Sequence, residues 1–79
     1  MIVVEVRLSA ALREHLRSPD AGLLRVELPA GATLPDLYAA LGLKAELVAF
    51  STVNNRYPEK GYQLRAGDRL RIVAHAVGG

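Results

Sequence analysis

Both ends of this chain alternate in polarity with a period of two, and this pattern constrains the fold more than any other feature. Residues 2–8 (IVVEVRL) place an aliphatic side chain at every second position, and residues 70–75 (LRIVAH) do nearly the same. A period of two predicts β-strands with one buried face. With only 79 residues there is room for one core. We therefore expect the first and last strands to lie side by side, in parallel, at the centre of one sheet.

Two helices are expected between these strands. Ser9 can cap a short helix over residues 10–17, which the turn-forming segment 18–22 (SPDAG) ends. Thr33 can open the second helix, with Asp36 as its capping-box partner and Gly42 as a left-handed C-cap.

Further strands are expected at residues 24–28 and 47–53. Asn54-Asn55 suits a tight turn, because Asn tolerates a positive φ, and Tyr57-Pro58 suits a short edge segment. The prediction is an α+β fold with a mixed sheet of four to five strands, one main helix packed across it and a second short helix. Residues 1–75 would form this domain, and residues 76–79 a flexible tail.

Composition excludes several classes of protein. The chain has no cysteine, so thiol nucleophiles, disulfides and Cys-ligated metals are excluded. A net charge of +2 without a basic block argues against nucleic-acid binding. No stretch is long and apolar enough for a membrane span or signal peptide, so we expect a soluble, cytoplasmic protein. His15 and His75, with no carboxylate cluster, predict no metal site.

The sequence ends on Gly78-Gly79, directly after the last predicted strand and the short segment Ala76-Val77. Glycine has no Cβ, so such an end can enter a narrow channel and present its carboxylate there. A strand that leads directly into this end would hold it in a defined direction relative to the folded domain. The alternative is a frayed terminus, where glycine is tolerated because nothing packs against it.

The whole chain resembles the MoaD/ThiS family of ubiquitin-like sulfur carriers. The resemblance lies in the order and spacing of short motifs: IVVEVRL at 2–8, LRE at 12–14, LPAGAT at 28–33 leading into LYAAL at 37–41, VNN at 53–55, LRAGDRL at 64–70 and VGG at 77–79.

That resemblance implies a β-grasp fold and a carrier that needs no catalytic side chain and binds no cofactor. A ubiquitin-activating-like adenylyltransferase would adenylate the Gly79 carboxylate with ATP, and a sulfur donor would convert it to a thiocarboxylate. The sulfur would serve molybdopterin synthesis, in complex with a molybdopterin synthase large subunit. Other family members serve thiamine, cysteine or tRNA thiolation. A protein modifier joined to lysines through Gly79, or an inert interaction module, would share the fold.

Four residues near the tail are candidates for partner binding: Val73, Tyr57, Arg71 and His75. Two positions that hold docking aromatics in the family are Ser9 and Val73 here, so a smaller patch is expected. His75-Ala76 resembles the thiamine-type tail, whereas the helix after the first strand resembles the molybdopterin type.

Overall fold

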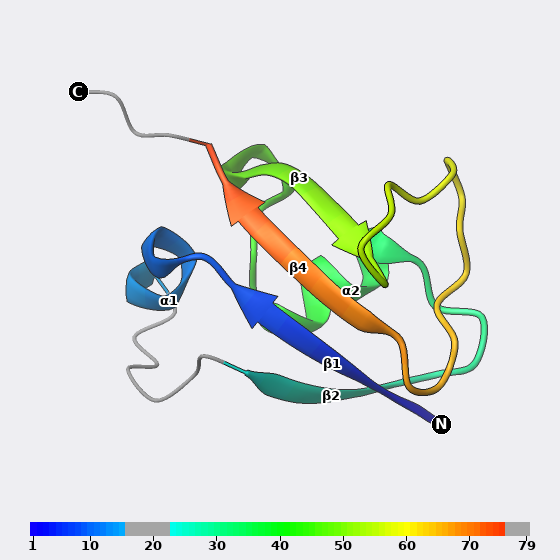
Figure 1. The fold of residues 1–79 in the computed structure, drawn as a ribbon. Coiled ribbons are helices and arrows are strands. Elements are labelled where there is room, and N and C mark those ends of the chain that lie inside the picture. The colour runs from blue at the N-terminus through cyan, green and yellow to red at the C-terminus, as the bar shows by residue number, and fades with distance from the viewer. Residues whose placement is uncertain (16–22, 76–79) are drawn as a thin grey trace.

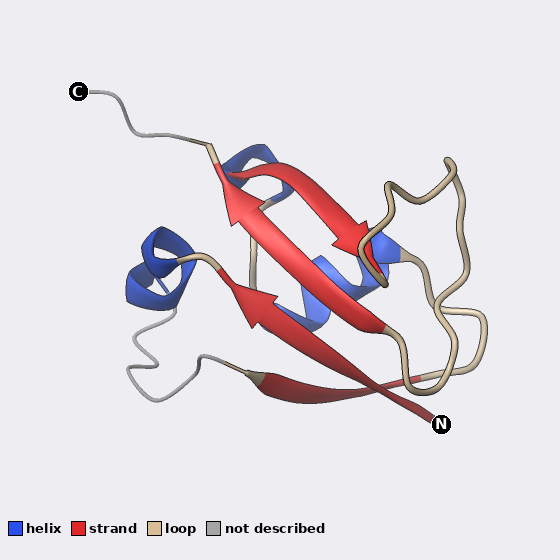
Figure 2. Cartoon of the chain, in the orientation of Figure 1, coloured by secondary structure: helices blue, strands red, loops and turns tan. Residues whose placement is uncertain are grey.

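The computed structural model describes residues 1–15 and 23–75, which form one four-stranded sheet with a helix across one face (Figures 1 and 2). The strands are β1 (Ile2–Leu8), β2 (Leu24–Leu28), β3 (Val48–Val53) and β4 (Arg69–Ala74), in the spatial order β2-β1-β4-β3. The central strands β1 and β4 are parallel, and β2 and β3 pair antiparallel with them at the two edges. The predicted mixed sheet with a central parallel pair is confirmed.

The helices are α1 (Ala10–His15), α2 (Leu34–Leu41) and the 3-10 turn η1 (Ala45–Leu47). In Figure 1, α2 lies behind the sheet and α1 lies beside the ends of β1 and β4. The core forms between α2 and the sheet, where Val6 of β1, Leu37 of α2 and Ile72 of β4 are fully buried. Leu12 brings α1 into the same core. None of the helices in the described ranges is long and apolar enough to cross a membrane.

Local signals set the ends of α2 as predicted. The Asp36 carboxylate accepts hydrogen bonds from the Thr33 N–H (2.9 Å) and from the Thr33 hydroxyl (3.1 Å). Gly42 ends the helix at φ 71°, and the Leu43 N–H donates to the Tyr38 carbonyl (2.8 Å). Glycine adopts this left-handed conformation more easily than residues with a Cβ, so its position favours the end of the helix here.

Two local predictions are wrong. The Ser9 hydroxyl, expected to cap α1, instead accepts a hydrogen bond from the Ala74 N–H (3.2 Å), because Ser9 lies against the end of β4. No strand forms at Tyr57-Pro58, because Pro58 has no N–H to donate and the chain turns away from the sheet. This region contributes only isolated bridges, Val53–Arg56 and Thr33–Gln63, so the described sheet has four strands rather than five.

The connection between β3 and β4 is held by the buried carboxylate of Asp68. It accepts hydrogen bonds from the Tyr62 hydroxyl (2.8 Å), the Arg65 N–H (2.9 Å) and the Asn54 amide (3.1 Å). Burial alone would raise the pKa of Asp68, but these hydrogen bonds to the charged form outweigh burial, and the pKa lies below its ordinary value. The same bond to Asp68 raises the pKa of Tyr62. This connection is thus a satisfied polar network.

Candidate functional site: the open face of the sheet

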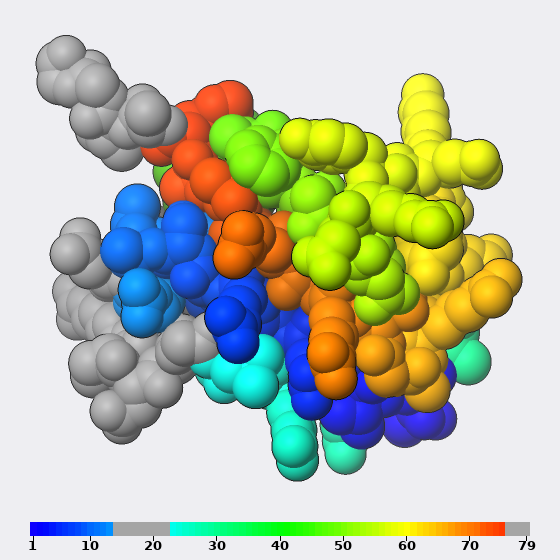
Figure 3. All heavy atoms as spheres, viewed as in Figure 1, coloured from blue at the N-terminus to red at the C-terminus, as the bar shows by residue number. Residues whose placement is uncertain are grey.

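The side of the sheet opposite α2 is the face that the described helices leave uncovered, and Figures 1 and 3 are viewed from this side. We call it the open face. Strand register places on it Glu5, Arg7, Arg25, Phe50, Thr52, Arg69, Arg71 and Val73. Its charged and aromatic side chains contrast with the aliphatic face beneath, where Val6, Leu70 and Ile72 are buried.

An apolar patch lies on the open face beside the end of β4. Val73 is half-buried and is the register partner of Phe50 on β3, whose ring is 41% exposed. The Tyr57 ring packs against Phe50 with ring centroids 6.0 Å apart and is itself 75% exposed. Isolated exposed apolar residues are ordinary, but two aromatic rings in tilted contact (57° between their planes) next to an aliphatic residue resemble the apolar centre of a protein interface. We call Phe50, Tyr57 and Val73 the aromatic patch.

The last described residues fix where the tail leaves the sheet. Because β4 pairs with β1 on one side and β3 on the other, its path is set from both sides. After β4 ends, the His75 N–H donates to the Leu47 carbonyl (3.0 Å), and the His75 side chain is exposed. The four predicted tail residues, Ala76, Val77, Gly78 and Gly79, lie outside the described residues.

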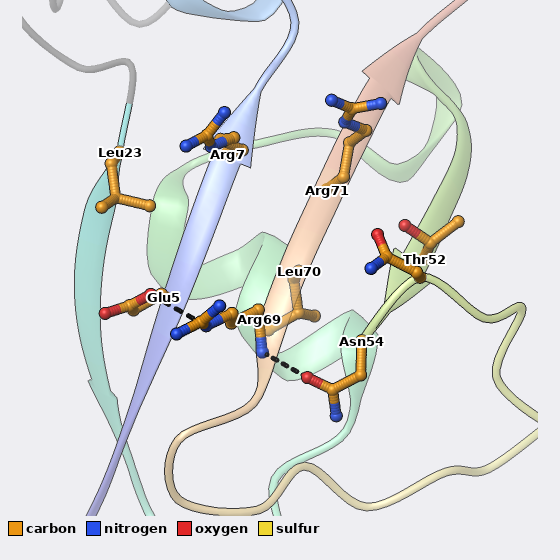
Figure 4. A pocket seen from close by; sticks show the side chains of 9 residues that line it. Glu5, Arg7, Leu23, Thr52, Asn54, Arg69, Leu70 and Arg71 are labelled. Atoms are coloured by element: carbon orange, nitrogen blue, oxygen red, sulfur yellow. Dashed lines mark hydrogen bonds and ion pairs between the residues drawn. The ribbon is translucent and has the colours of Figure 1, made fainter.

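A hollow of about 680 Å³ occupies the other half of the open face (Figure 4). Figure 4 shows Arg7 and Arg71 on neighbouring strands, with Glu5 and Arg69 one row below. Glu5 and Arg69 form an ion pair at 3.7 Å, and the Arg69 N–H donates to the Asn54 side-chain oxygen (3.0 Å). The lining of this hollow therefore carries charges of both signs, which could form ion pairs with a partner protein.

Three of the four residues predicted to bind a partner lie on or beside the same part of the open face, and the fourth follows at the end of β4. Val73 and Tyr57 both contact or flank Phe50, and Arg71 lies on the same face of β4 as Val73. His75 follows at the end of the strand as an exposed side chain. Sequence reasoning missed Phe50, although it is the chain's single phenylalanine and lies in the segment predicted as a strand. Its place on the open face follows from the register of β3 against β4, which only the structure shows.

The described residues contain no group of three His, Asp or Glu side chains that could hold a metal ion. The prediction for His75 stays a prediction about partner contact, and the side chain of His15 is not described.

Solved structures similar to this one share its whole fold. The protein assigned as molybdopterin converting factor, subunit 1, from Pyrococcus furiosus superposes with a TM-score of 0.77 at 24% sequence identity, over 94% of this chain and 98% of that one. Small archaeal modifier protein 1 of H. volcanii gives 0.73 at 22% identity, over 94% and 98% of the two chains. SAMP1 from Haloferax volcanii gives 0.70 at 24% identity, over 98% and 99%. The predicted β-grasp, ubiquitin-like fold is confirmed.

The sequence matches no family model and no curated protein. The comparisons thus establish the fold.

Proposed function

We propose that this protein is a sulfur carrier whose Gly79 carboxylate is adenylated and then converted to a thiocarboxylate, with molybdopterin synthesis as the recipient. The observation that carries the proposal is the position of β4. This strand is bonded on both sides at the centre of a ubiquitin-like fold and leads within five residues of Ala74 to Gly78-Gly79. A strand fixed on both sides and followed closely by two glycines in the sequence is suited to deliver a carboxylate into another protein's active site.

The chemistry needs no side chain of the carrier. A Gly79 carboxylate oxygen attacks the α-phosphorus of ATP, and pyrophosphate leaves. A sulfur donor then supplies hydrosulfide, which attacks the acyl carbon. The acyl C–O bond breaks, AMP leaves, and a thiocarboxylate remains. The activating enzyme supplies the catalytic groups, and the carrier supplies its tail and a surface that the enzyme recognises.

The aromatic patch is our proposed docking site for that enzyme, with Arg71 and His75 at its border. Phe50 and Tyr57 present apolar area that a partner would bury, and aromatic residues and arginine are enriched in interfaces. A molybdopterin synthase large subunit could use the same face when the tail enters its active site.

One alternative is conjugation of Gly79 to lysines of other proteins, which the name of small archaeal modifier protein 1 suggests for that protein. The tail and its activation would be the same, and only the acceptor would differ. Carriers for thiamine, cysteine or tRNA thiolation would also share the tail.

Intact-mass spectrometry of the protein from its native cells tests the proposal and separates these outcomes. The mass first establishes whether Gly79 is the mature C-terminus. A gain of one oxygen-to-sulfur exchange on the last residue supports the carrier, and ladders of larger species carrying the chain support the modifier. Deletion of Gly79 without loss of either product, or of molybdopterin, would leave the fold as an inert interaction module and overturn the proposal.

The docking site has its own test, carried out with candidate activating enzymes, ATP and a sulfur source. Charge reversal at Arg71 combined with Val73→Asp should leave the circular dichroism spectrum intact and slow adenylation at least tenfold. Arg25→Glu, on the same face but on the edge strand β2, serves as a matched control and should change the rate less than twofold. An unchanged rate in the double variant would remove this surface from the proposal.

A further inference from the structure

A second hollow, of about 380 Å³, lies where β1 ends, α1 begins and β4 approaches its last residues. Three arginines line it: Arg7 from β1, Arg13 from α1 and Arg71 from β4. The other lining residues are Leu8, Ser9, Ala10 and Val73, so among the side chains that the structure describes none in its wall is acidic. We call this the arginine hollow.

The charges in the arginine hollow are unbalanced in a way that the rest of the open face is not. Arg7 and Arg71 are register partners on neighbouring strands, and like charges directly across a sheet destabilise it. One row away, the equivalent partners are Glu5 and Arg69, which form an ion pair at 3.7 Å. Two neighbouring register pairs of β1 and β4 thus differ in charge. Glu5 and Arg69 form the paired row, in which the charges are opposite, and Arg7 and Arg71 form the unpaired row, in which they are alike.

The third arginine carries a stronger signal. The Arg13 Nε is buried and has no hydrogen-bond partner in the part of the chain whose side chains the structure describes, residues 1–13 and 23–75. A buried donor without an acceptor costs about 1–3 kcal/mol, so buried polar atoms are nearly always paired in stable proteins. Arg13 is also held in place, because its N–H donates to the Ser9 carbonyl (3.0 Å) and the neighbouring Leu12 is buried in the core. The unpaired donor therefore belongs to a residue that lines the hollow and whose backbone is fixed.

We propose that the arginine hollow is a carboxylate-binding site that receives an acidic side chain, Asp or Glu, from a partner protein. The guanidinium group presents several N–H donors in a planar fork that matches a carboxylate. A carboxylate placed among Arg7, Arg13 and Arg71 would offset the repulsion between the first and last of these. Rotation of the Arg13 side chain toward this carboxylate would also give the buried Nε an acceptor.

The rest of the surface selects a protein as the source of the anion. Val73 belongs both to the arginine hollow and to the aromatic patch, so an anion bound here lies next to exposed apolar area. A protein segment with an acidic residue beside aliphatic ones complements both features, whereas free phosphate complements only the arginines. A nucleic-acid backbone would meet Glu5 and Glu27 among the arginines of the same face, and a continuous run of phosphates does not match this mixture of charges. The site stands on the described residues and does not depend on the activation of Gly79.

The test uses the full chain labelled with ¹⁵N and a synthetic, end-blocked octapeptide in which glutamate alternates with leucine. The Arg13 Nε–H resonance reports directly whether this donor gains an acceptor. We expect it to shift on titration with the peptide, and we expect a glutamine-for-glutamate peptide to leave it in place. Inorganic phosphate at matched ionic strength should shift it less than the glutamate peptide at equal concentration.

Variants show whether the three arginines act specifically. Arg13→Gln and Arg71→Gln should each weaken binding of the glutamate peptide about tenfold, the loss of one charge-assisted hydrogen bond. Arg69→Gln removes the same charge from the same face outside the arginine hollow, so it should change binding less than twofold. A chain lacking Gly79 should bind equally well, which separates failure of this site from failure of the sulfur-carrier proposal.

Three results would overturn the inference. The first is equal weakening by Arg69→Gln, which would mean general electrostatic attraction. The second is a phosphate-induced shift as large as the peptide's, which would make the hollow a site for free anions. The third is a silent Arg13 Nε–H resonance up to the solubility of the peptide.

Discussion

The polar groups near the start of β4 and those farther along the strand differ in whether they have partners. At its start, the buried carboxylate of Asp68 receives three hydrogen bonds from Asn54, Tyr62 and Arg65, and every partner belongs to this chain. Toward its end, Arg7 and Arg71 lie side by side and the Arg13 Nε finds no partner within the described residues. Buried polar groups are costly unless paired. The first end is therefore built for stability, whereas the second retains binding capacity for another molecule.

The largest loss of stability should come from removing the hydrogen bonds of Asp68 at the start of β4. Asp68→Ala removes the acceptor of three hydrogen bonds, and we expect a loss of about 2–4 kcal/mol in the free energy of unfolding. For a domain of this size that lowers Tm by about 10–25 °C. Urea denaturation and calorimetry would measure both quantities.

Asp68→Asn, which keeps the volume, guards against a variant that is too unstable to measure. Asp36→Ala provides a matched control, because it removes an exposed carboxylate that caps α2 and should cost only about 1 kcal/mol. A loss at Asp68 no larger than the loss at Asp36 would contradict the contrast between the two ends of β4.

The next effect is the response of the same network to pH. The pKa of Asp68 is lower in the folded protein than in the unfolded chain, so the folded state binds this proton less tightly. Its stabilisation is present above the ordinary Asp pKa of 3.8 and is lost as the pH falls through the lowered folded pKa. The pKa of Tyr62 is raised, so its contribution is present below 10.0 and is lost as the pH rises through the folded pKa.

Urea denaturation in steps across both pH ranges would measure these two losses. In Asp68→Asn the acid-dependent loss should shrink, and in Tyr62→Phe the alkaline loss should shrink. Arg71→Gln, at the other end of β4, should leave both pH dependences as they are in the unmodified protein. Equal acid sensitivity in the unmodified protein and in Asp68→Asn would show that other carboxylates control the acid response.

Most of the fold could be predicted because its signals are local. Period-two alternation predicts β1, β2 and β4, and the glycine at position 42 and the aspartate at position 36 set the ends of α2. Asn54 and Asn55 adopt positive φ values of 52° and 66°, as their side chains allow.

The features that could not be predicted depend on residues distant in sequence. Residues 47–53 (LVAFSTV) carry large apolar side chains at both parities, and an irregularity lies between Val48 and Phe50. The sequence therefore gives no reason to place Phe50 on the open face. Burial of Asp68 requires Asn54 and Tyr62 to reach it across a long connection.

The candidate site was predicted less completely than the fold. Val73, Tyr57 and Arg71 were proposed from the sequence, and the structure adds Phe50 to them through strand register. Arg13 reaches the arginine hollow only because α1 folds against the ends of β1 and β4, and no sequence spacing relates it to Arg71. The position of the Arg13 side chain depends on how α1 packs against the sheet, and local sequence patterns do not show this packing.

The smallest effect tests the unpaired row directly. Arg7→Gln removes one of two like charges, so at low ionic strength we expect a gain of about 0.2–0.5 kcal/mol in the free energy of unfolding. Glu5→Gln, one row away, removes the ion pair with the largely exposed Arg69 and should cost at most about 1 kcal/mol. Both differences should fade in high salt, because exposed charges are screened. Urea denaturation at two ionic strengths would measure them.

A loss of stability in Arg7→Gln would mean that a carboxylate elsewhere in this chain already pairs with Arg7. The arginine hollow would then be satisfied from within, and the contrast between the two ends of β4 would fail at the point where the carboxylate-binding inference needs it.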